Sequence, residues 1–248
     1  MSRCLVCDEG KKEALTWRSL LVRTEAKAIC ERCEGKLNRI TGETCKMCSR
    51  ELVGNYSTGD LCLDCSRWER DREWGGYLSK NISLFHYNEY LKDIIAKYKY
   101  RGDYALAEVF VPFMKDRLKD MEFDLVTAIP LSDERLRERG FNQGQALADL
   151  LGLQTVETLT RIHSEKQSKK SRQDRLSLPQ VFRVIHPDLL EHKSILIIDD
   201  IYTTGTTLRQ AAKSLKQLGP KKYHPSPLLG ETAHFNQHPK VSPVLFDI

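Results

Sequence analysis

Four cysteine pairs with C-x2-C spacing lie within the first 65 residues of this chain, and residues 66–248 contain no cysteine. A C-x2-C turn directs two sulfurs at one ion, and two such pairs complete a tetrahedral Cys4 site. The pattern therefore predicts two zinc ions, with an iron–sulfur cluster or a redox dithiol as the alternatives. Because four thiolates leave no coordination position for a catalytic water, the metal is expected to be structural. The predicted ligands are Cys4, Cys7, Cys30, Cys33, Cys45, Cys48, Cys62 and Cys65.

The spacing leaves the partition of these ligands open. A sequential arrangement gives the first four cysteines to one ion and the last four to the other, whereas an interleaved arrangement uses the same residues. Residues 1–75 hold too few apolar side chains for a core of their own, so metal binding is expected to stabilise this module. The glycine pair Gly75-Gly76 marks its predicted boundary.

Composition and charge narrow the class of protein. Thiols arranged for metal suit a reducing compartment, so a cytoplasmic location is expected. No apolar run approaches the roughly 20 residues that cross a bilayer, and the N-terminus lacks the apolar segment of a secretory signal. We therefore expect no membrane insertion. The formal net charge of +5 permits a nucleic-acid partner without requiring one.

Residues 76–220 show an α/β pattern. Apolar side chains recur at helical spacing over 90–98, 142–151 and 208–218, whereas 125–129 and 194–198 are short apolar runs typical of buried parallel strands. We therefore predict a parallel sheet with flanking helices, preceded by the small zinc module. The tail 221–248 holds four of the nine prolines, and no strand is predicted there.

Residues 195–207 read I-L-I-I-D-D-I-Y-T-T-G-T-T, an apolar strand followed by two acids and a hydroxyl-rich loop. Free N–H groups and the dipole at the start of the next helix favour a phosphate, while the acids are placed to accept hydrogen bonds from ribose hydroxyls and to help hold Mg²⁺. An ordinary β–α turn explains one acid and one threonine, but not this run. The predicted ribose-phosphate ligands are Asp199, Asp200, Tyr202, Thr203, Thr204, Gly205, Thr206 and Thr207.

This segment resembles the phosphoribosyl-pyrophosphate (PRPP) signature of type I phosphoribosyltransferases. Segments 97–103, 129–132, 137–143 and 166–170, together with the C-x2-C module, make residues 1–220 similar to the ComF-type competence family. The resemblance implies a type I phosphoribosyltransferase-like sheet, a pyrophosphate loop after Ile129 and a flexible hood at 164–177. It also implies two partners, single-stranded DNA and a helicase-like ATPase. No residue identifies itself as catalytic or as part of an acceptor pocket.

Basic side chains gather in three clusters. Two functional roles are open, neutralising pyrophosphate and following a nucleic-acid backbone, and the same side chains could serve both. A solvated surface is the alternative for each cluster, above all for the middle one, where glutamates alternate with arginines. The candidates are Lys99, Arg101, Arg137, Arg139, Lys166, Lys169, Lys170, Arg172 and Arg175.

Three functional hypotheses follow. The first is a DNA-uptake protein with a PRPP or ribose 5-phosphate site that binds single-stranded DNA and an ATPase partner, its zinc module serving for protein docking in preference to DNA binding. The second is an active phosphoribosyltransferase with an unidentified acceptor. The third is a zinc-dependent adaptor whose phosphoribosyl site is vestigial.

Overall fold

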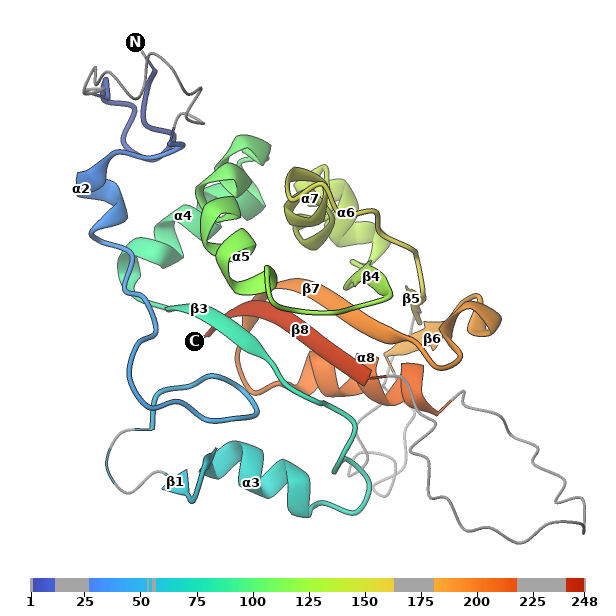
Figure 1. Cartoon of the computed structure of the whole chain (residues 1–248). Coiled ribbons are helices and arrows are strands. Elements are labelled where there is room, and N and C mark those ends of the chain that lie inside the picture. The colour runs from blue at the N-terminus through green and yellow to red at the C-terminus, as the bar shows by residue number, and fades with distance from the viewer. Residues whose placement is uncertain are drawn as a thin grey trace, which may run out of the picture.

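The sheet of the α/β portion has four parallel strands in the order β3-β8-β7-β4. The computed structural model describes residues 2–11, 27–52, 54, 57–162, 181–217 and 240–247. Figure 1 shows α4, α5 and α7 over one face of the sheet, with α8 and α3 on the opposite side. The strands are β3 (Ile82–His86), β4 (Leu125–Ala128), β7 (Ser194–Tyr202) and β8 (Lys240–Asp247).

The predicted parallel sheet with flanking helices is confirmed. In the helix predicted over 90–98, Leu91, Ile94, Ile95 and Tyr98 face the core, as their spacing requires. Asparagine or serine caps begin α4, α6 and α7, each accepting a hydrogen bond from a backbone N–H of the first turn. The flanking helices are α4 (Glu89–Tyr100), α5 (Val111–Leu118), α6 (Asp133–Arg139), α7 (Gln143–Leu150) and α8 (Thr206–Lys216), with a 3-10 helix η1 (Tyr104–Val109).

Short elements make up the rest of the described chain. A two-stranded antiparallel sheet, β5 with β6, follows α7, and another, β1 with β2, lies in the cysteine-rich part. Their bounds are β5 (Leu159–Arg161), β6 (Phe182–Val184), β1 (Ser57–Thr58) and β2 (Leu61–Cys62). The helical pieces are α2 (Glu31–Glu34), α3 (Leu63–Arg70) and η3 (Pro187–Leu190).

The prediction that the tail 221–248 contains no strand is wrong. β8 pairs with β3 on one side and β7 on the other, with Ile197 opposite Pro243 and Ile198 opposite Val244. A central proline removes one ladder donor, at a cost of about 1 kcal/mol. Backbone pairing with two partner strands along Lys240–Asp247 outweighs that cost. Residues 218–239 lie outside the described residues.

The cysteine-rich part packs on both sides of the sheet. Cys4 and Cys33 belong to the apolar cluster that contains Leu91 and Phe110, whereas the four cysteines of 45–65 share a cluster with Ile195 and Leu208. Between them, the backbone of residues 38–40 hydrogen-bonds to β3, through Ile40 N to Leu84 O at 3.1 Å and His86 N to Asn38 O at 2.8 Å. This segment covers the outer edge of β3, a position that would otherwise expose unpaired backbone groups.

A chain ending at residue 239 tests the place of β8. Without β8, the facing backbone groups of β3 and β7 lose their partners. We therefore expect the cooperative thermal unfolding transition to disappear, or its midpoint Tm to fall by at least 10 °C. A change in the free energy of unfolding of about 1 kcal/mol already shifts Tm by several degrees. Circular dichroism melting measures this. A chain lacking only Ile248 is the matched control, and an unchanged Tm in the longer truncation would contradict the central position of β8.

Candidate functional site

The loop after β7, residues 203–205, leads directly into the start of α8. Gly205 caps α8 with a φ of +76°, and a Cβ at this position would collide with the hydroxyl of Tyr202. Thr203 and Thr204 are exposed, and the Thr204 Oγ1 lies 2.8 Å from the Thr206 Oγ1. Because the first N–H groups of a helix lack intrahelical acceptors, the loop presents amides and hydroxyls to solvent at the positive end of α8.

Tyr202 differs from its neighbours in the predicted set. Its side chain is 3% exposed and lies in the apolar cluster of the second cysteine group. The ring therefore supports the loop at Gly205 from beneath, and only the backbone of Tyr202 remains available to a ligand.

The two acids in the last part of β7, Asp199 and Asp200, have different surroundings. The Asp200 carboxylate meets the Lys99 ammonium at 2.7 Å, with side chains 10% and 12% exposed. Asp199 accepts a hydrogen bond from Asp200 N at 2.9 Å. Desolvation, followed by the neighbouring Asp200 carboxylate, raises the pKa of Asp199 to about 7. Asp200 is thus paired with a lysine, while the pKa of Asp199 lies near neutral pH.

The structure brings together some of the predicted basic residues and leaves others apart. Lys99 pairs with Asp200, as described above. The Arg139 guanidinium donates to Gln143 Oε1 at 2.8 Å and lies 5.8 Å from the Tyr100 ring centroid. Arg101 and Arg137 are exposed. The hood residues Lys166, Lys169, Lys170, Arg172 and Arg175 lie outside the described residues.

Arg161, at the end of β5, was missed from sequence. Desolvation and the like charge of Arg135 lower the pKa of Arg161, and the Asp199 carboxylate opposes this shift. Arg135, Arg161 and Asp199 are therefore close enough to interact electrostatically. The available signal was its position, because Arg161 ends a short strand immediately before the basic stretch at 164–177.

The backbone fixes the segment expected to be the pyrophosphate loop beside these acids. Ile129 N donates to Ile198 O at 3.0 Å, and the Asn142 side chain donates to Ile129 O at 2.9 Å. At Gly144 a Cβ would lie 2.6 Å from Ile198 O, so only glycine allows α7 this close to β7. The end of β4, the start of α7 and the acids thus form one edge.

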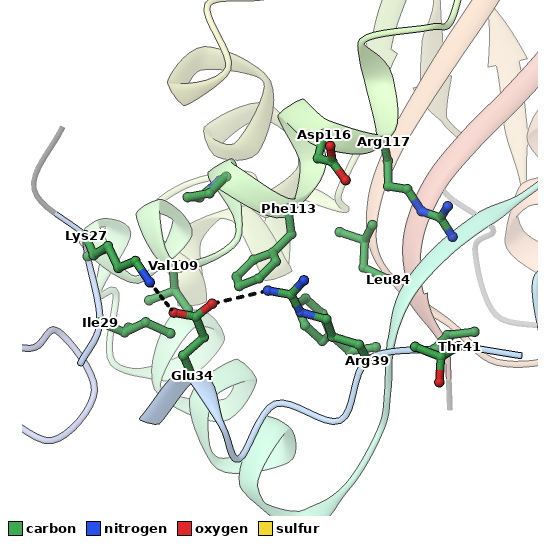
Figure 2. A pocket seen from close by; sticks show the side chains of 14 residues that line it. Lys27, Ile29, Glu34, Arg39, Thr41, Leu84, Val109, Phe113, Asp116 and Arg117 are labelled. Carbon is green, nitrogen blue, oxygen red and sulfur yellow. Dashed lines mark hydrogen bonds and ion pairs between the residues drawn. The ribbon is translucent and has the colours of Figure 1, made fainter. Parts of the chain in front are cut away.

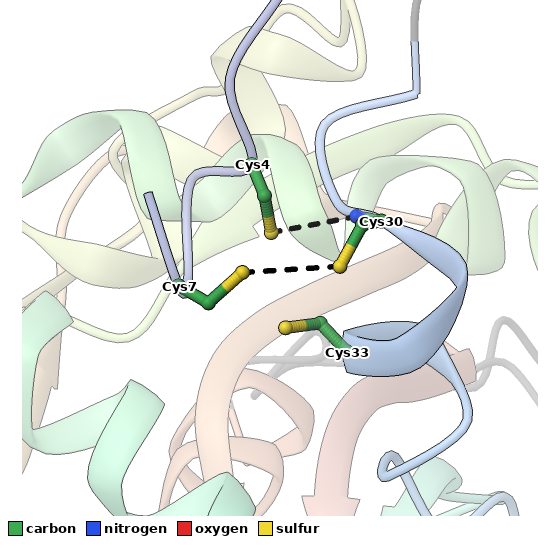
Figure 3. A group of neighbouring side chains, drawn as sticks. All are labelled: Cys4, Cys7, Cys30 and Cys33. Carbon is green, nitrogen blue, oxygen red and sulfur yellow. Dashed lines mark hydrogen bonds between the residues drawn. The ribbon is translucent and has the colours of Figure 1, made fainter. Parts of the chain in front are cut away.

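The eight cysteines form two groups, and both fit a tetrahedral metal. Within each group the sulfurs all lie within 4.8 Å of one another, and the partition is sequential. Figure 3 shows the first group, Cys4, Cys7, Cys30 and Cys33, with Cys7 and Cys30 Sγ 3.8 Å apart. In the second group Cys48 and Cys62 Sγ are 3.6 Å apart. A disulfide needs about 2.05 Å, whereas metal–sulfur bonds of about 2.3 Å place tetrahedral sulfurs about 3.8 Å apart.

A separate pocket of about 390 Å³ lies between the first cysteine group and α5. Figure 2 shows Arg39 over the Phe113 ring, at 4.4 Å from its centroid, and Glu34 between Lys27 and Arg39, at 3.0 and 3.2 Å. These charges pair with one another across an apolar floor. None of the residues that line this pocket belongs to the segment 199–207.

Among the helices that the structure describes, none has both the length and the apolar character needed to cross a bilayer.

Comparison with known proteins agrees with this geometry. The family described as "Phosphoribosyl transferase domain" matches residues 137–225, which include both acids and the segment Thr203–Thr207. Among solved structures, the allosteric regulatory enzyme of purine biosynthesis aligns over 53% of this chain and 23% of its own, with 16% identity and a TM-score of 0.33. That likeness is too weak to carry weight.

Curated relatives match over most of their length. Competence protein ComFC of Bacillus subtilis is 36% identical over 220 residues, covering 87% of this chain and 89% of its own. Competence protein ComFC of Streptococcus pneumoniae is 33% identical, with coverage of 88% and 96%. Competence protein F of Haemophilus influenzae is 23% identical, covering 77% and 91%. This chain therefore belongs to the ComFC family of competence proteins, with an α/β portion of the phosphoribosyltransferase type.

Proposed function

We propose that this protein acts in the cytoplasm during DNA uptake, and that it binds PRPP or a related ribose phosphate, single-stranded DNA and a helicase-like ATPase. The observation that carries the proposal is the exposed threonine loop at the start of α8, which begins at Thr203, three residues after the acid pair Asp199 and Asp200. The competence proteins to which this chain is similar support the process. The family match over 137–225 supports the ligand class.

Each part of the ribose phosphate has a counterpart at the site. The N–H groups at the start of α8 and the hydroxyls of Thr203 and Thr204 suit a 5-phosphate, and the acids suit the ribose hydroxyls, since an ionised carboxylate only accepts hydrogen bonds. Lys99 offsets one carboxylate at 2.7 Å. The edge can therefore receive a polyanion although it contains two adjacent acids.

A pyrophosphate group would extend toward Arg135 and Arg161, whose charges act on each other beside Asp199. Carboxylate oxygens at a strand end are the donors that Mg²⁺ prefers, and Asp199 and Asp200 are the residues that would hold it. When bound, the ion would neutralise phosphate charge.

Phosphoribosyl transfer is a second candidate function, favoured by the state of Asp199. A carboxyl whose pKa is about 7 can accept or release a proton at neutral pH. Turnover of PRPP with and without single-stranded DNA distinguishes this candidate from ligand binding alone. If ribose 5-phosphate and PRPP both fail to bind, the adaptor with a vestigial site is the hypothesis that remains.

A surface for single-stranded DNA lies next to this edge. Tyr100 is 70% exposed, with the Arg139 guanidinium 5.8 Å from its ring centroid, and exposed Arg101 follows it. Exposed aromatic rings beside cationic side chains are the usual means of holding unpaired bases without sequence preference. The basic residues of the hood, 164–177, would add contacts to the phosphate backbone of the DNA.

The two cysteine groups are proposed to hold zinc. All four cysteines of the second group are buried, and the first group includes two partly exposed ones. Four thiolates and a divalent ion carry a formal charge of −2 and leave no open coordination position, so the ions stabilise structure and do not react. The exposed outer side of this module is the proposed docking region for the ATPase.

Replacing Gly205 by alanine tests the phosphate loop. The new Cβ would meet the Tyr202 hydroxyl and would need a φ of +76°, so we expect affinity for ribose 5-phosphate to fall at least tenfold, about 1.4 kcal/mol. The readout is the rise in Tm produced by the ligand. Gly152→Ala is the control, because Gly152 has a φ of +73° in open space. A wild-type Tm rise in Gly205→Ala would contradict the assignment.

The binding of ribose 5-phosphate should depend on pH through Asp199. Since protonation removes the acceptor, affinity is expected to be high above the pKa of about 7 and to fall as the pH drops through that value. Between pH 8 and pH 6 the ionised fraction of such a group falls about tenfold. Calorimetric titration across this range measures the effect. Asp199→Asn should retain only the dependence that comes from the ligand's own phosphate, and an equal slope in both proteins would refute the role of Asp199.

Tyr100→Ala and Arg101→Ala test the DNA surface. Loss of the ring should weaken binding of single-stranded DNA by about 1–3 kcal/mol with little change in salt dependence, whereas loss of the arginine should reduce the salt slope by about 0.7. Fluorescence anisotropy at several salt concentrations separates the two effects. Lys80→Ala is the control, since exposed Lys80 precedes β3 at the opposite end of the sheet. Equal effects in all three variants would argue against a defined surface.

A further inference from the structure

The second cysteine group is joined to the phosphate loop by two side chains that donate to loop carbonyls. Arg50 Nη2 donates to Thr203 O at 3.2 Å, and Trp68 Nε1 donates to Thr204 O at 2.9 Å. Arg50 follows Cys48 by two residues, and Trp68 lies one helical turn beyond Cys65 in α3. Both donors therefore depend on the segments that carry the cysteines of this group.

These donors are themselves held in place. Arg50 Nη1 lies 2.7 Å from Asp64 Oδ2, and Asp64 is adjacent to Cys65. The Trp68 ring packs edge-on against Trp74 at 5.9 Å between centroids. Two hydrogen bonds to successive carbonyls fix the backbone orientation of the loop, because the carbonyl and the next N–H share one rigid peptide plane. Arg50 and Trp68, which hold these carbonyls, therefore also set the direction of the N–H groups that the loop would offer to a phosphate.

Arg209 forms a third connection, from the helix itself. Its side chain is fully buried, and Nη1 lies 2.8 Å from Glu69 Oε1 while Nη2 lies 3.9 Å from Cys65 Sγ. Its guanidinium carbon is 5.2 Å from the Trp68 ring centroid. Because Arg209 N also bonds Gly205 O at 2.9 Å, the first turn of α8 and the cysteine group share one buried cation. A buried charge is tolerated only while its partners stay in position.

Farther along α8, two lysines repeat the pattern. Lys213 lies 2.8 Å from Glu73 Oε1, and Lys216 donates to Gly76 O at 2.9 Å. The side of α8 that faces away from the sheet is thus held by residues 65–76 along most of its length. None of these connections involves the first cysteine group, which lies with α4 and α5.

We propose that metal occupancy of the second cysteine group and ribose-phosphate binding at Thr203–Thr207 are energetically coupled, with Arg50 and Trp68 as the positioning residues. The inference rests on the proposed ribose-phosphate site. Ion binding at Cys45, Cys48, Cys62 and Cys65 fixes the segments that carry both donors, and through them the loop. Since coupling between two sites is reciprocal, the ligand must strengthen zinc binding by the factor by which zinc strengthens ligand binding.

The test measures how zinc partitions between the full-length protein and a competing chelator, with and without saturating ribose 5-phosphate. We expect one zinc equivalent per chain to become about tenfold harder to remove, within the 5–150-fold range of typical couplings. The zinc ion at the first cysteine group should be removed equally easily with and without ribose 5-phosphate, and it is the internal control. In Trp68→Phe, which keeps the ring and loses the N–H donor, and in Arg50→Gln, this protection should fall at least threefold.

A matched variant and a separate titration complete the design. Arg39→Gln alters a cation beside the first group, which pairs with Glu34 at 3.2 Å, and should retain the full protection. Calorimetry of ribose 5-phosphate with the zinc-loaded protein separates the two proposals. Binding without any change in zinc partition overturns the coupling and leaves the proposed function intact. Absence of binding overturns both, and full protection in Trp68→Phe and Arg50→Gln overturns the role of these donors.

Discussion

The parallel pairing of β4 with β7 decides where the charged groups of this protein meet. β4 ends at Ala128, opposite Ile198, whereas β7 continues to Tyr202. Asp199 and Asp200 therefore lie just beyond the end of β4, and both strands leave the sheet on the same edge. The acids, the loop after Ile129 and the start of α8 converge there because carboxyl ends of parallel strands share an edge. The position of the acids and their pairing with Lys99 follow from this register.

The charged groups in this part of the molecule form largely buried ion pairs, Lys99 with Asp200 and Arg209 with Glu69. Lys99 and Asp200 are both nearly buried, and Arg209 is completely so. Buried ion pairs rarely stabilise a fold more than apolar residues of the same volume would, because desolvation cancels most of their attraction. These ion pairs are therefore better understood as fixing the orientation of the segment 199–209 than as a source of stability.

Local patterns allowed much of this arrangement to be predicted from sequence. The run of aliphatic residues before Asp199 predicts β7, the helical spacing from Tyr90 to Tyr98 predicts α4, and the C-x2-C pairs predict both Cys4 groups. The tail was misjudged because Pro243 argued against a strand. The composition of this segment carries no information about β3 and β7, the two strands whose backbone groups pair with β8.

Contacts between distant segments could not be predicted. The hydrogen bond from Trp68 to Thr204 joins residues 136 positions apart, and nothing near either residue records it. The electrostatic interaction of Arg161 with Asp199 was likewise not predictable, because it depends on β5 lying near the acids in the folded chain. Tyr202 illustrates a different limit, because its place in the signature predicts a ligand contact without specifying the atoms, and its ring is buried against Gly205. A motif identifies a segment, and the packing decides which of its side chains are available.

The position of β8 has a consequence for how the chain acquires its structure. β8 follows β3, β4 and β7 in the sequence but lies between β3 and β7 in space, so during synthesis on the ribosome its partners emerge first and must wait. Pairs such as Ile82 with Val244 are among the most remote in the chain, and contacts of such long range form slowly. Until β8 arrives, the facing edges of β3 and β7 remain open to other chains. During synthesis the unpaired edges of β3 and β7 are therefore exposed for a time, and a chaperone bound to them would prevent association with other chains.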